Sequence, residues 1–557
     1  MKPPWTRPAK QGQRNSASSA DRSFQPALNQ VVQHLMGGAV DSALQAAQAL
    51  AQQHPHNPEA WHVLGIACIE NRQFEAAIEH LQRAIGLHAA NAAYHYHLGI
   101  ALYESGQHEE SIAAYQRCLT LEPKNQKALD NLCAALQKAD RLEEALDTAH
   151  QSLQLQPNNA VGYNNLASLC LKLQRLDECL EAARRAIEID PLLAEARTTR
   201  ASALIQKGAY SEAISEVDFA LQLTPNKSDF LIVKALALGS SRNFQAALDC
   251  YEQIEKIDPN NHNARHNQSL FLLSNEHFDR GFELYENRFL YDNAPPKLIT
   301  ESATKWVPGW HCEKLLIWQE QGIGDMIFYA SALKFIGQVA QSVTVVVDRR
   351  LIPLLQRSFP LLRFIELGQP IDPGSYDAHA PIADIAAHFF KHPEFIADRL
   401  GGYLSSDTQL RNRIRAHYAA DRPLCGITWS SGNNQIGDKK SIPLSGWLPV
   451  LQSMNASFVS LQYGDTQADR QALLQEHGIE ILEHPGIDNF QDIDAHAALI
   501  DACDCLFLVS NTSAHIAGAL GKTTYMVQAH ATGRLWYWKN TRGKQSLWYP
   551  SITLYAE

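Results

Sequence analysis

One stretch in the second half of the chain, IWQEQGIGDMIFYASAL, places two glycines and a carboxylate where an apolar run gives way to a helical pattern. Gly322 and Gly324 would let the backbone turn tightly and approach a ligand closely, and Asp325 falls at the helix start. A carboxylate held there could accept a proton from a hydroxyl group that attacks a bound substrate. The alternative is that Asp325 only caps the helix, a role that aspartate fills well.

A second stretch, CLFLVSNTSAHIAGALGKTTYMV, carries polar side chains at the same kind of junction between a strand and a helix. These side chains belong to Ser510, Asn511, Thr512, Ser513 and His515. Hydroxyl groups and the free backbone N–H groups of a helix start bind anions, and a diphosphate suits such a site. The stretch therefore predicts a phosphate-binding turn.

Two other loops add weaker candidates. Trp429 ends the run CGITW, and Lys440 lies further along the loop that follows, ahead of a helical pattern. A lysine there could neutralise a phosphate, although a loop lysine surrounded by water is the common alternative. Gln462 ends the run FVSLQ. We expect all three residues to bind the same phosphate-containing ligand.

The element pattern after residue 291 explains how these residues could meet. Short apolar runs alternate with helix-length segments: KLLIW, VTVVV, RFIEL and YDAHAPI, then CGITW, FVSLQ, IEIL, CLFLV and TYMVQ. Such alternation is typical of parallel α/β units. A break within LSSDTQLRNRIRAHYAADRP divides the region into two predicted lobes, residues 292–415 and 416–557. Open α/β sheets bind ligands at the carboxyl ends of their strands, so we expect the site in a cleft between the lobes.

The first half of the chain repeats with a period of 34 residues. Prolines recur at Pro123, Pro157, Pro191, Pro225 and Pro259. Small residues form a second column at Ala43, Ala77, Ser111, Ala145, Cys179, Ala213, Ala247 and Gly281. This period, with small residues where two helices cross and proline after the second helix, is the signature of the tetratricopeptide repeat (TPR). We predict a TPR array over residues 24–291, an α-solenoid of about seven to eight helical hairpins with a concave groove.

One column of the array is predicted to face that groove and holds His97, Asn131, Asn165 and Asn267. An asparagine amide offers hydrogen-bond donors and an acceptor, so it can bond a peptide backbone whatever the peptide's sequence. The alternative is that asparagine is simply common at this TPR position. In either case the array predicts a polypeptide partner, because extended concave surfaces are what solenoids provide.

The composition argues against several classes of protein. A formal net charge of −11 disfavours a general nucleic-acid binder. No apolar run approaches the roughly 20 residues needed to cross a bilayer, and residues 1–23 are polar, which predicts a disordered lead without a secretory signal. Ten cysteines without a C-x-x-C pair favour reduced thiols in a cytoplasmic protein. Asp492 and Asp494 form a D-x-D pattern that we interpret as helix-cap and surface residues, so no metal is expected.

Taken together, these stretches resemble the heptosyltransferase-like (family 9) glycosyltransferases of the GT-B fold. The closer match is the bacterial group in which TPRs precede such a domain. The G-x-G-D motif, the segment DACDCLFLVSNTSAHIAGALGK, the terminal RLWYWKNTRGKQSLWYPSITLY and the junction YENRF all look like that group. The resemblance implies a TPR superhelix followed by an α/β GT-B fold of two Rossmann-like lobes. Some members of the group glycosylate flagellins, which makes a flagellin-like protein one expected acceptor.

The resemblance also implies roles for individual residues. Asp325 matches the proposed general base, and Lys440 matches a basic residue near the donor phosphates. Asn511, Thr512 and His515 match the donor-diphosphate segment. The implied activity is a metal-independent, inverting transfer from a nucleotide-sugar co-substrate to an acceptor hydroxyl, with no cofactor. This chain departs from the group at one position, since it has Ser510 where many relatives have aspartate.

Two alternatives stay open. One is a nucleotide-dependent oxidoreductase, because Gly322-x-Gly324 after a strand, with Asp348 closing the next strand, imitates a Rossmann fingerprint. Ile327 occupies the place of the third glycine, which weakens that interpretation. The other is a TPR scaffold whose transferase region is inactive, and the departure at Ser510 favours it.

Overall fold

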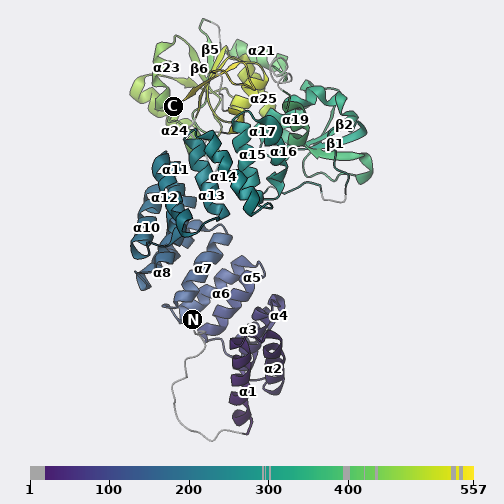
Figure 1. The fold of residues 1–557 in the computed structure, drawn as a ribbon. Helices are drawn as coiled ribbons and strands as arrows, with labels where there is room; N and C mark the ends of the chain where they lie inside the picture. The colour runs from purple at the N-terminus through teal and green to yellow at the C-terminus, as the bar shows by residue number, and fades with distance from the viewer. Residues whose placement is uncertain are drawn as a thin grey trace. The chain divides into compact units, whose positions relative to one another are not determined.

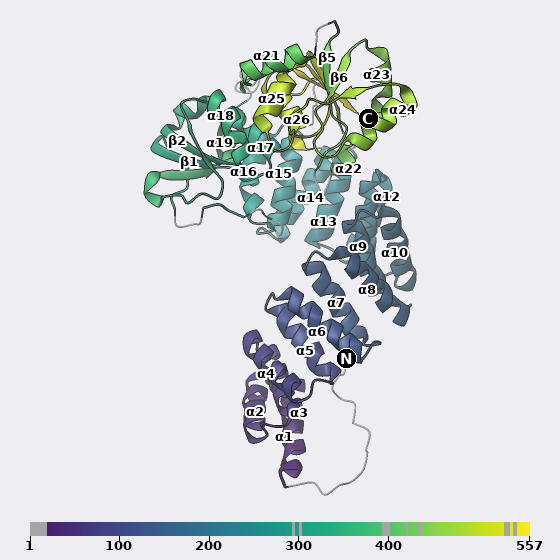
Figure 2. The same ribbon diagram turned by 180° about the vertical axis from the view of Figure 1, so that it is seen from behind.

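The structure is a computed structural model, and it describes residues 19–291, 294, 296–299, 303–392, 402–418, 421–432, 437–528, 535–538 and 543–556. The chain divides into two compact units, Met1–Ala237 and Leu238–Glu557. Helices occupy the first unit and the start of the second, and parallel sheets follow (Figure 1; Figure 2 gives the reverse view).

Paired helices make up the predicted repeat region. They are α1 (Ser19–Met36), α2 (Val40–Gln53), α3 (Pro58–Glu70), α4 (Phe74–Leu87), α5 (Ala92–Glu104), α6 (His108–Leu121), α7 (Gln126–Lys138), α8 (Leu142–Leu155), α9 (Ala160–Lys172), α10 (Leu176–Ile189), α11 (Ala194–Gln206), α12 (Tyr210–Leu223), α13 (Ser228–Ser240), α14 (Phe244–Ile257), α15 (His262–Ser274) and α16 (Phe278–Tyr285). The helical solenoid is therefore confirmed. Helix α1 begins at Ser19, within the predicted lead of residues 1–23, and Phe24 and Leu28 of this helix pack against the core at Val31. Residues 1–18 lie outside the described residues.

Local chemistry explains why the pairs repeat. The column of small residues is buried, as in Ala77 and Ala145, which lets the two helices of a pair approach closely. Asparagines at the same period cap the first helix of several pairs. Asn57, Asn91 and Asn125 each accept a hydrogen bond from a backbone N–H group two or three residues on. This capping column was not part of the sequence prediction, although its 34-residue spacing is visible in the sequence.

The first sheet contains four parallel strands in the order β3-β2-β1-β4. Its elements are β1 (Cys312–Trp318), α17 (Ile323–Ala330), η2 (Ser331–Gln338), β2 (Ala340–Val347), η3 (Arg349–Leu351), α18 (Ile352–Ser358), β3 (Arg363–Glu366), η4 (Pro373–Ser375), β4 (Ala378–Pro381) and α19 (Ile382–Phe390). The four strands coincide with the runs predicted for the first lobe.

The second sheet contains six parallel strands in the order β10-β9-β8-β5-β6-β7. Its elements are α21 (Thr408–His417), β5 (Leu424–Ile427), α22 (Gly437–Lys440), η5 (Leu444–Trp447), α23 (Leu448–Ser453), β6 (Ser457–Ser460), α24 (Gln467–His477), β7 (Ile481–Leu482), α25 (Ile493–Ala502), β8 (Cys505–Val509), α26 (Thr512–Ala519), β9 (Thr524–Gln528), η7 (Trp536–Trp538) and β10 (Ile552–Ala556). Five of its strands were predicted. The short edge strand β10 was not.

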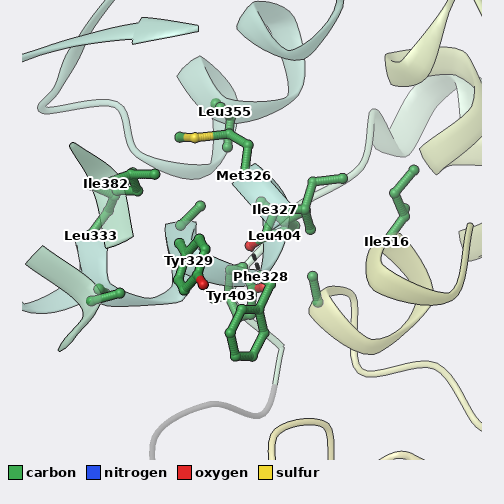
Figure 3. Packing of buried hydrophobic residues seen from close by; sticks show 14 of the residues in the cluster. Met326, Ile327, Phe328, Tyr329, Leu333, Leu355, Ile382, Tyr403, Leu404 and Ile516 are labelled. Atoms are coloured by element: carbon green, nitrogen blue, oxygen red, sulfur yellow. Dashed lines mark hydrogen bonds between the residues drawn. The ribbon is translucent and has the colours of Figure 1, made fainter. Parts of the chain in front are cut away.

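Helices α17 and α26 pack against each other between the two sheets, so one apolar core joins the lobes. Figure 3 shows Ile327 of α17 beside Ile516 of α26. The hydroxyl of Tyr403 donates a 2.6 Å hydrogen bond to the carbonyl of Ile327. Since α17 carries Asp325 and α26 begins at Thr512, this packing fixes the distance between the two predicted halves of the site.

A buried ion-pair network joins the last repeat helices to the first sheet. Arg288, in the short helix η1 (Glu286–Phe289), contacts Glu320 at 2.7 Å and Asp384 at 2.6 Å. Both the Arg288 and the Glu320 side chains are almost fully removed from water. Helices α14, α15 and α16 belong to the same compact unit as the sheets.

No helix among the described residues is both long and apolar enough to cross a membrane.

Candidate functional site

A cavity of about 410 Å³ lies at the carboxyl ends of the strands of both sheets. Its lining comprises Gly322, Ile323, Gly324, Asp325, Arg350, Ser431, Gly432, Lys440, Tyr463, Asn489, Phe490, Ile493, His496, Ser510, Asn511, Thr512, Ser513, His515, Leu535 and Tyr537. The predicted base, the predicted lysine and the predicted phosphate-binding turn therefore share one cavity. This agrees with the expectation of a ligand site between two α/β lobes.

Asp325 lies in the first turn of α17 and is held by a residue from the far end of the chain. The hydroxyl of Tyr537 donates a 2.7 Å hydrogen bond to its carboxylate. Burial raises the pKa of Asp325, whereas the hydrogen bond from Tyr537, the charge of Lys440 and nearby backbone N–H groups each oppose that rise. The carboxylate is thus a stronger base than an exposed aspartate and is oriented by a defined donor.

Glycine is needed at position 324 because a side chain of the facing helix lies close to it, and not because the backbone turns there. A Cβ atom at this position would lie 2.9 Å from Cδ2 of His515, a buried ring on the facing helix. Gly322, in contrast, is the N-cap of α17 with φ −63° and ψ 171°, a conformation open to any residue. The conformation at Gly322 therefore does not require glycine, and of the two positions only Gly324 must lack a side chain.

Lys440 faces Asp325 across the cavity from the second lobe. The residue is buried, and this desolvation lowers the pKa of its ammonium group, while the charge of Asp325 partly restores it. A partly desolvated lysine in a cavity is well placed to bind an anion, because the ammonium group regains a charged partner when the anion enters.

The turn that leads into α26 has the geometry of a helix start. The Asn511 side chain caps α26 by accepting from the backbone N–H of Ala514 at 3.3 Å, and its amide donates to the carbonyl of Ser430 at 3.3 Å. Ser510 and Thr512 line the cavity beside it. Burial and the charge of Lys440 hold the pKa of His515 at about 3, so this ring is neutral at neutral pH.

Gln462 and Trp429, which were predicted to bind the ligand, make hydrogen bonds within the second lobe instead. The side-chain oxygen of Gln462 accepts from the backbone N–H groups of Trp429 and Ser430, at 3.1 and 2.9 Å. The Trp429 indole is buried in the core of the second lobe and donates to Asp469 at 2.7 Å. Neither residue is among the described residues that line the cavity. Their placement at strand ends was predicted, but their side chains point into the protein.

The cavity also contains residues that were not predicted. Arg350 follows β2 and donates to the carbonyl of Phe490 at 3.2 Å, with its guanidinium 4.8 Å from the centre of the Phe490 ring. The same side chain pairs with Asp348 at 2.8 Å, so the carboxylate proposed in the oxidoreductase alternative is already paired. Asn489, His496 and Tyr537 are further unpredicted polar residues of the lining, which also contains Ser431 and Tyr463. The place of Arg350 just after β2 is a signal from which it could have been predicted. Asn489, His496 and Tyr537 have no comparable signal in the sequence.

The four predicted groove residues differ in their environments. His97 is buried and contacts His62 at 3.0 Å and the carbonyl of Ala93 at 2.8 Å, so its assignment to the peptide groove is wrong. The amide of Asn131 is half-buried and donates to the hydroxyl of Tyr115 at 3.4 Å. Asn165 is exposed in the first unit, and Asn267 is half-buried in the second.

The interpretation of the D-x-D pattern is supported by the contacts of its two aspartates. Asp492 caps α25 by accepting from the backbone N–H of Ala495 at 2.9 Å. Asp494 pairs with Arg357 at 2.5 Å. Within the described ranges no cluster of three or more histidine, cysteine or acidic side chains could hold a metal ion.

Comparison with known proteins identifies the repeats. Models of the tetratricopeptide-repeat family match residues 34–85, 64–125 and 160–191. Protein FlbA of Caulobacter vibrioides is 28% identical over 267 residues, which is 44% of this chain and 43% of that protein. The chain thus aligns with less than half the length of this relative.

Solved structures of repeat proteins are similar to parts of the chain. YrrB, a TPR protein with an unusual peptide-binding site, shares 21% identity, with a TM-score of 0.29, over 35% of this chain and 100% of that chain. A tetratricopeptide repeat protein from Parabacteroides merdae shares 15% identity, with a TM-score of 0.38, over 45% of this chain and 99% of that chain.

Proposed function

We propose that the chain is a glycosyltransferase of the GT-B type that moves a sugar from a nucleotide-activated donor to a hydroxyl group, and that its TPRs bind the acceptor protein. One observation carries the proposal. Asp325 on α17, Lys440 of the second lobe and the turn that begins α26 line the same cavity. A base and an anion-binding site in one cavity are what a sugar transfer with a phosphate leaving group needs.

The anion-binding wall would stabilise the departing nucleotide. The ammonium group of Lys440 and the backbone N–H groups at the start of α26 provide positive charge where negative charge grows on phosphate. The aspartate that many relatives have at position 510 is serine here, so the wall carries one negative charge fewer. That difference bears on which nucleotide fits the site.

Asp325 would activate the acceptor. An acceptor hydroxyl has a pKa far above neutral, so its proton must leave during attack, and Asp325 is the carboxylate available for it. Burial strengthens this base, and the hydrogen bond from Tyr537 holds it in one orientation. Attack from the side opposite the leaving group would invert the configuration at the sugar carbon.

The TPRs support a protein acceptor, since such arrays bind polypeptides along extended surfaces. Flagellin is the acceptor to test first, on the resemblance to TPR-linked glycosyltransferases. A protein-binding scaffold without catalysis is the second candidate, and the exchange of aspartate for Ser510 favours it.

The test is transfer by the purified full chain. The chain is incubated with a flagellin and, in turn, with nucleotide sugars that carry uridine, guanosine, adenosine, thymidine or cytidine. Intact-mass spectrometry then measures sugar added to the flagellin, and a coupled assay measures the nucleotide released. We expect at least one donor to give both signals. Binding of the flagellin without nucleotide release from any donor would support the scaffold instead.

A further inference from the structure

Three polar side chains form a hydrogen-bonded chain in the wall of the cavity. Nε2 of His496 lies 2.9 Å from the hydroxyl oxygen of Ser513, and Nδ1 of His496 lies 2.8 Å from Oδ1 of Asn489. All three residues line the cavity, and His496 and Ser513 are each only 1% exposed. They come from α25, from α26 and from the loop before α25.

The direction of this chain is fixed by the backbone around Asn489. Its amide nitrogen donates to the carbonyl oxygens of Gln462 at 3.0 Å and Ser460 at 3.4 Å. A carbonyl oxygen only accepts, so the atom beside these two carbonyls must be the NH₂ group. The other amide atom, which faces His496, is therefore the oxygen, an acceptor.

The histidine tautomer follows from that assignment. Nδ1 of His496 must carry the hydrogen, because it faces an oxygen that can only accept. Burial lowers the pKa of His496 to about 4, so the ring is neutral at neutral pH and Nε2 is a bare acceptor. The hydroxyl of Ser513 must then donate its hydrogen to Nε2. The Ser513 oxygen can then offer a ligand only its acceptor lone pairs.

This direction of the hydrogen bond between Ser513 and His496 disagrees with the phosphate-binding role predicted for the Ser513 hydroxyl. A phosphate oxygen at neutral pH accepts hydrogen bonds, and it would meet another acceptor at this serine. We infer that Ser513, oriented by His496 and Asn489, forms a subsite that binds a hydroxyl or amide N–H donor of the nucleotide sugar rather than its phosphates. The inference rests on the proposed function and adds to it a polar contact that distinguishes ligands bearing such a donor.

The donor group can belong to the base, the ribose or the transferred sugar, and the probes separate these sources. The full chain is titrated by calorimetry with inorganic pyrophosphate, UDP, 2′-deoxy-UDP, UDP-glucose and the matching guanosine, adenosine, thymidine and cytidine compounds. Each ligand is measured with the wild-type chain, Ser513→Ala and a control, Ser331→Ala. Ser331 is a buried serine of the first lobe whose hydroxyl donates to the carbonyl of Phe328, outside the described cavity lining.

We expect Ser513→Ala to weaken binding of the ligand with the matching hydroxyl roughly 3- to 10-fold, the value of one neutral hydrogen bond, and to leave pyrophosphate unchanged. Loss with UDP but not with 2′-deoxy-UDP would assign the contact to the ribose 2′-hydroxyl, and equal loss with both, with pyrophosphate unchanged, would assign it to the ribose 3′-hydroxyl or the base. Weaker binding of UDP-glucose, with unchanged binding of UDP, would assign the contact to the transferred sugar. His496→Gln should retain most of the wild-type affinity, since a glutamine carbonyl can also accept from Ser513, whereas His496→Leu should not.

Two results would overturn the inference, and they differ from failure of the proposed function. Equal weakening of pyrophosphate and of every nucleotide would show that Ser513 contacts phosphate. Unchanged binding of every ligand by a folded Ser513→Ala chain would show that it contacts none. If the wild-type chain binds no nucleotide in the panel, the proposed function itself fails, and the subsite fails with it. Should Ser513→Ala not fold, the pair His496→Gln and His496→Leu decides between the same outcomes.

Discussion

The hydroxyl of Tyr537 lies 2.7 Å from the carboxylate of Asp325, although 212 positions separate the two residues in the chain. The contact connects the carboxyl-terminal segment to the first lobe. It also supplies the carboxylate with a donor that favours its charged form. This single hydrogen bond therefore bears on both the orientation and the pKa of the proposed base.

We expect Tyr537→Phe to shift the pH dependence of sugar transfer. Burial already raises the pKa of Asp325, and removal of the donor would raise it further. Because the base must be ionised, activity is lost as the pH falls through this pKa, so the acidic limb of the profile should move to higher pH. The measurement is the initial rate of transfer between pH 4 and 9. An acidic limb at the wild-type pH with an intact fold would contradict the proposed role of Tyr537.

We expect Gly324→Ala to disturb the contact between the lobes. Its methyl group would lie 2.9 Å from the His515 ring, which is confined by Tyr537 and Trp538. Overpacking of this kind costs about 1–3 kcal/mol in the free energy of unfolding. Urea unfolding measures the loss, and Gly337→Ala is the control, since a Cβ there meets nothing within 4 Å. Equal stability of the two variants would contradict the proposed close packing.

We expect Arg288→Leu to destabilise the second unit strongly. It would leave Glu320 as a buried carboxylate without its cation, whereas Asp384 would keep only its pair with the half-exposed Lys305 at 3.0 Å; removing one partner of a buried pair costs about 3–5 kcal/mol. The matched control is Arg280→Leu, which breaks a half-exposed pair with Glu283 and should cost about 0–1 kcal/mol. Thermal unfolding followed by circular dichroism compares the two. A similar melting temperature for both variants would show that the buried network contributes little.

We expect Asn165→Ala to reduce modification of an acceptor protein but not hydrolysis of the donor. Asn165 is exposed in the repeat unit, far along the chain from the cavity residues, so the fold and the donor site should be unaffected. The ratio of protein-bound sugar to released sugar measures the effect. A ratio equal to the wild-type value would exclude Asn165 from acceptor binding.

The alternation of apolar runs was sufficient to predict nine strands, because buried parallel strands need continuous apolar sequence. The edge strand β10 was missed because its stretch, ITLYA, follows a segment without a helical pattern, so the alternation of strand and helix that marks the other strands is absent there. The repeat period likewise predicted the helix pairs, since each pair buries the same small residues. Periodic features of the fold were therefore readable from the sequence.

The site was predicted less completely. A position after a strand locates a residue at the correct edge of the sheet, but it does not say where the side chain points. Gln462 shows this, since it bonds the backbone of a neighbouring loop instead of facing the cavity. Tyr537 and His496 reach the cavity through contacts between distant segments, which no local pattern encodes. The burial of His97 against His62 depends in the same way on the stacking of neighbouring repeats.

The most direct test of the account compares Asp325→Asn with the wild-type chain in sugar transfer from the donor that the screen identifies. The substitution keeps the size of the side chain and removes the base. The account predicts a loss of transfer rate of about 10²- to 10⁴-fold, the usual contribution of a general base, while binding of the corresponding nucleoside diphosphate is retained. Full turnover by a folded Asp325→Asn chain would contradict it.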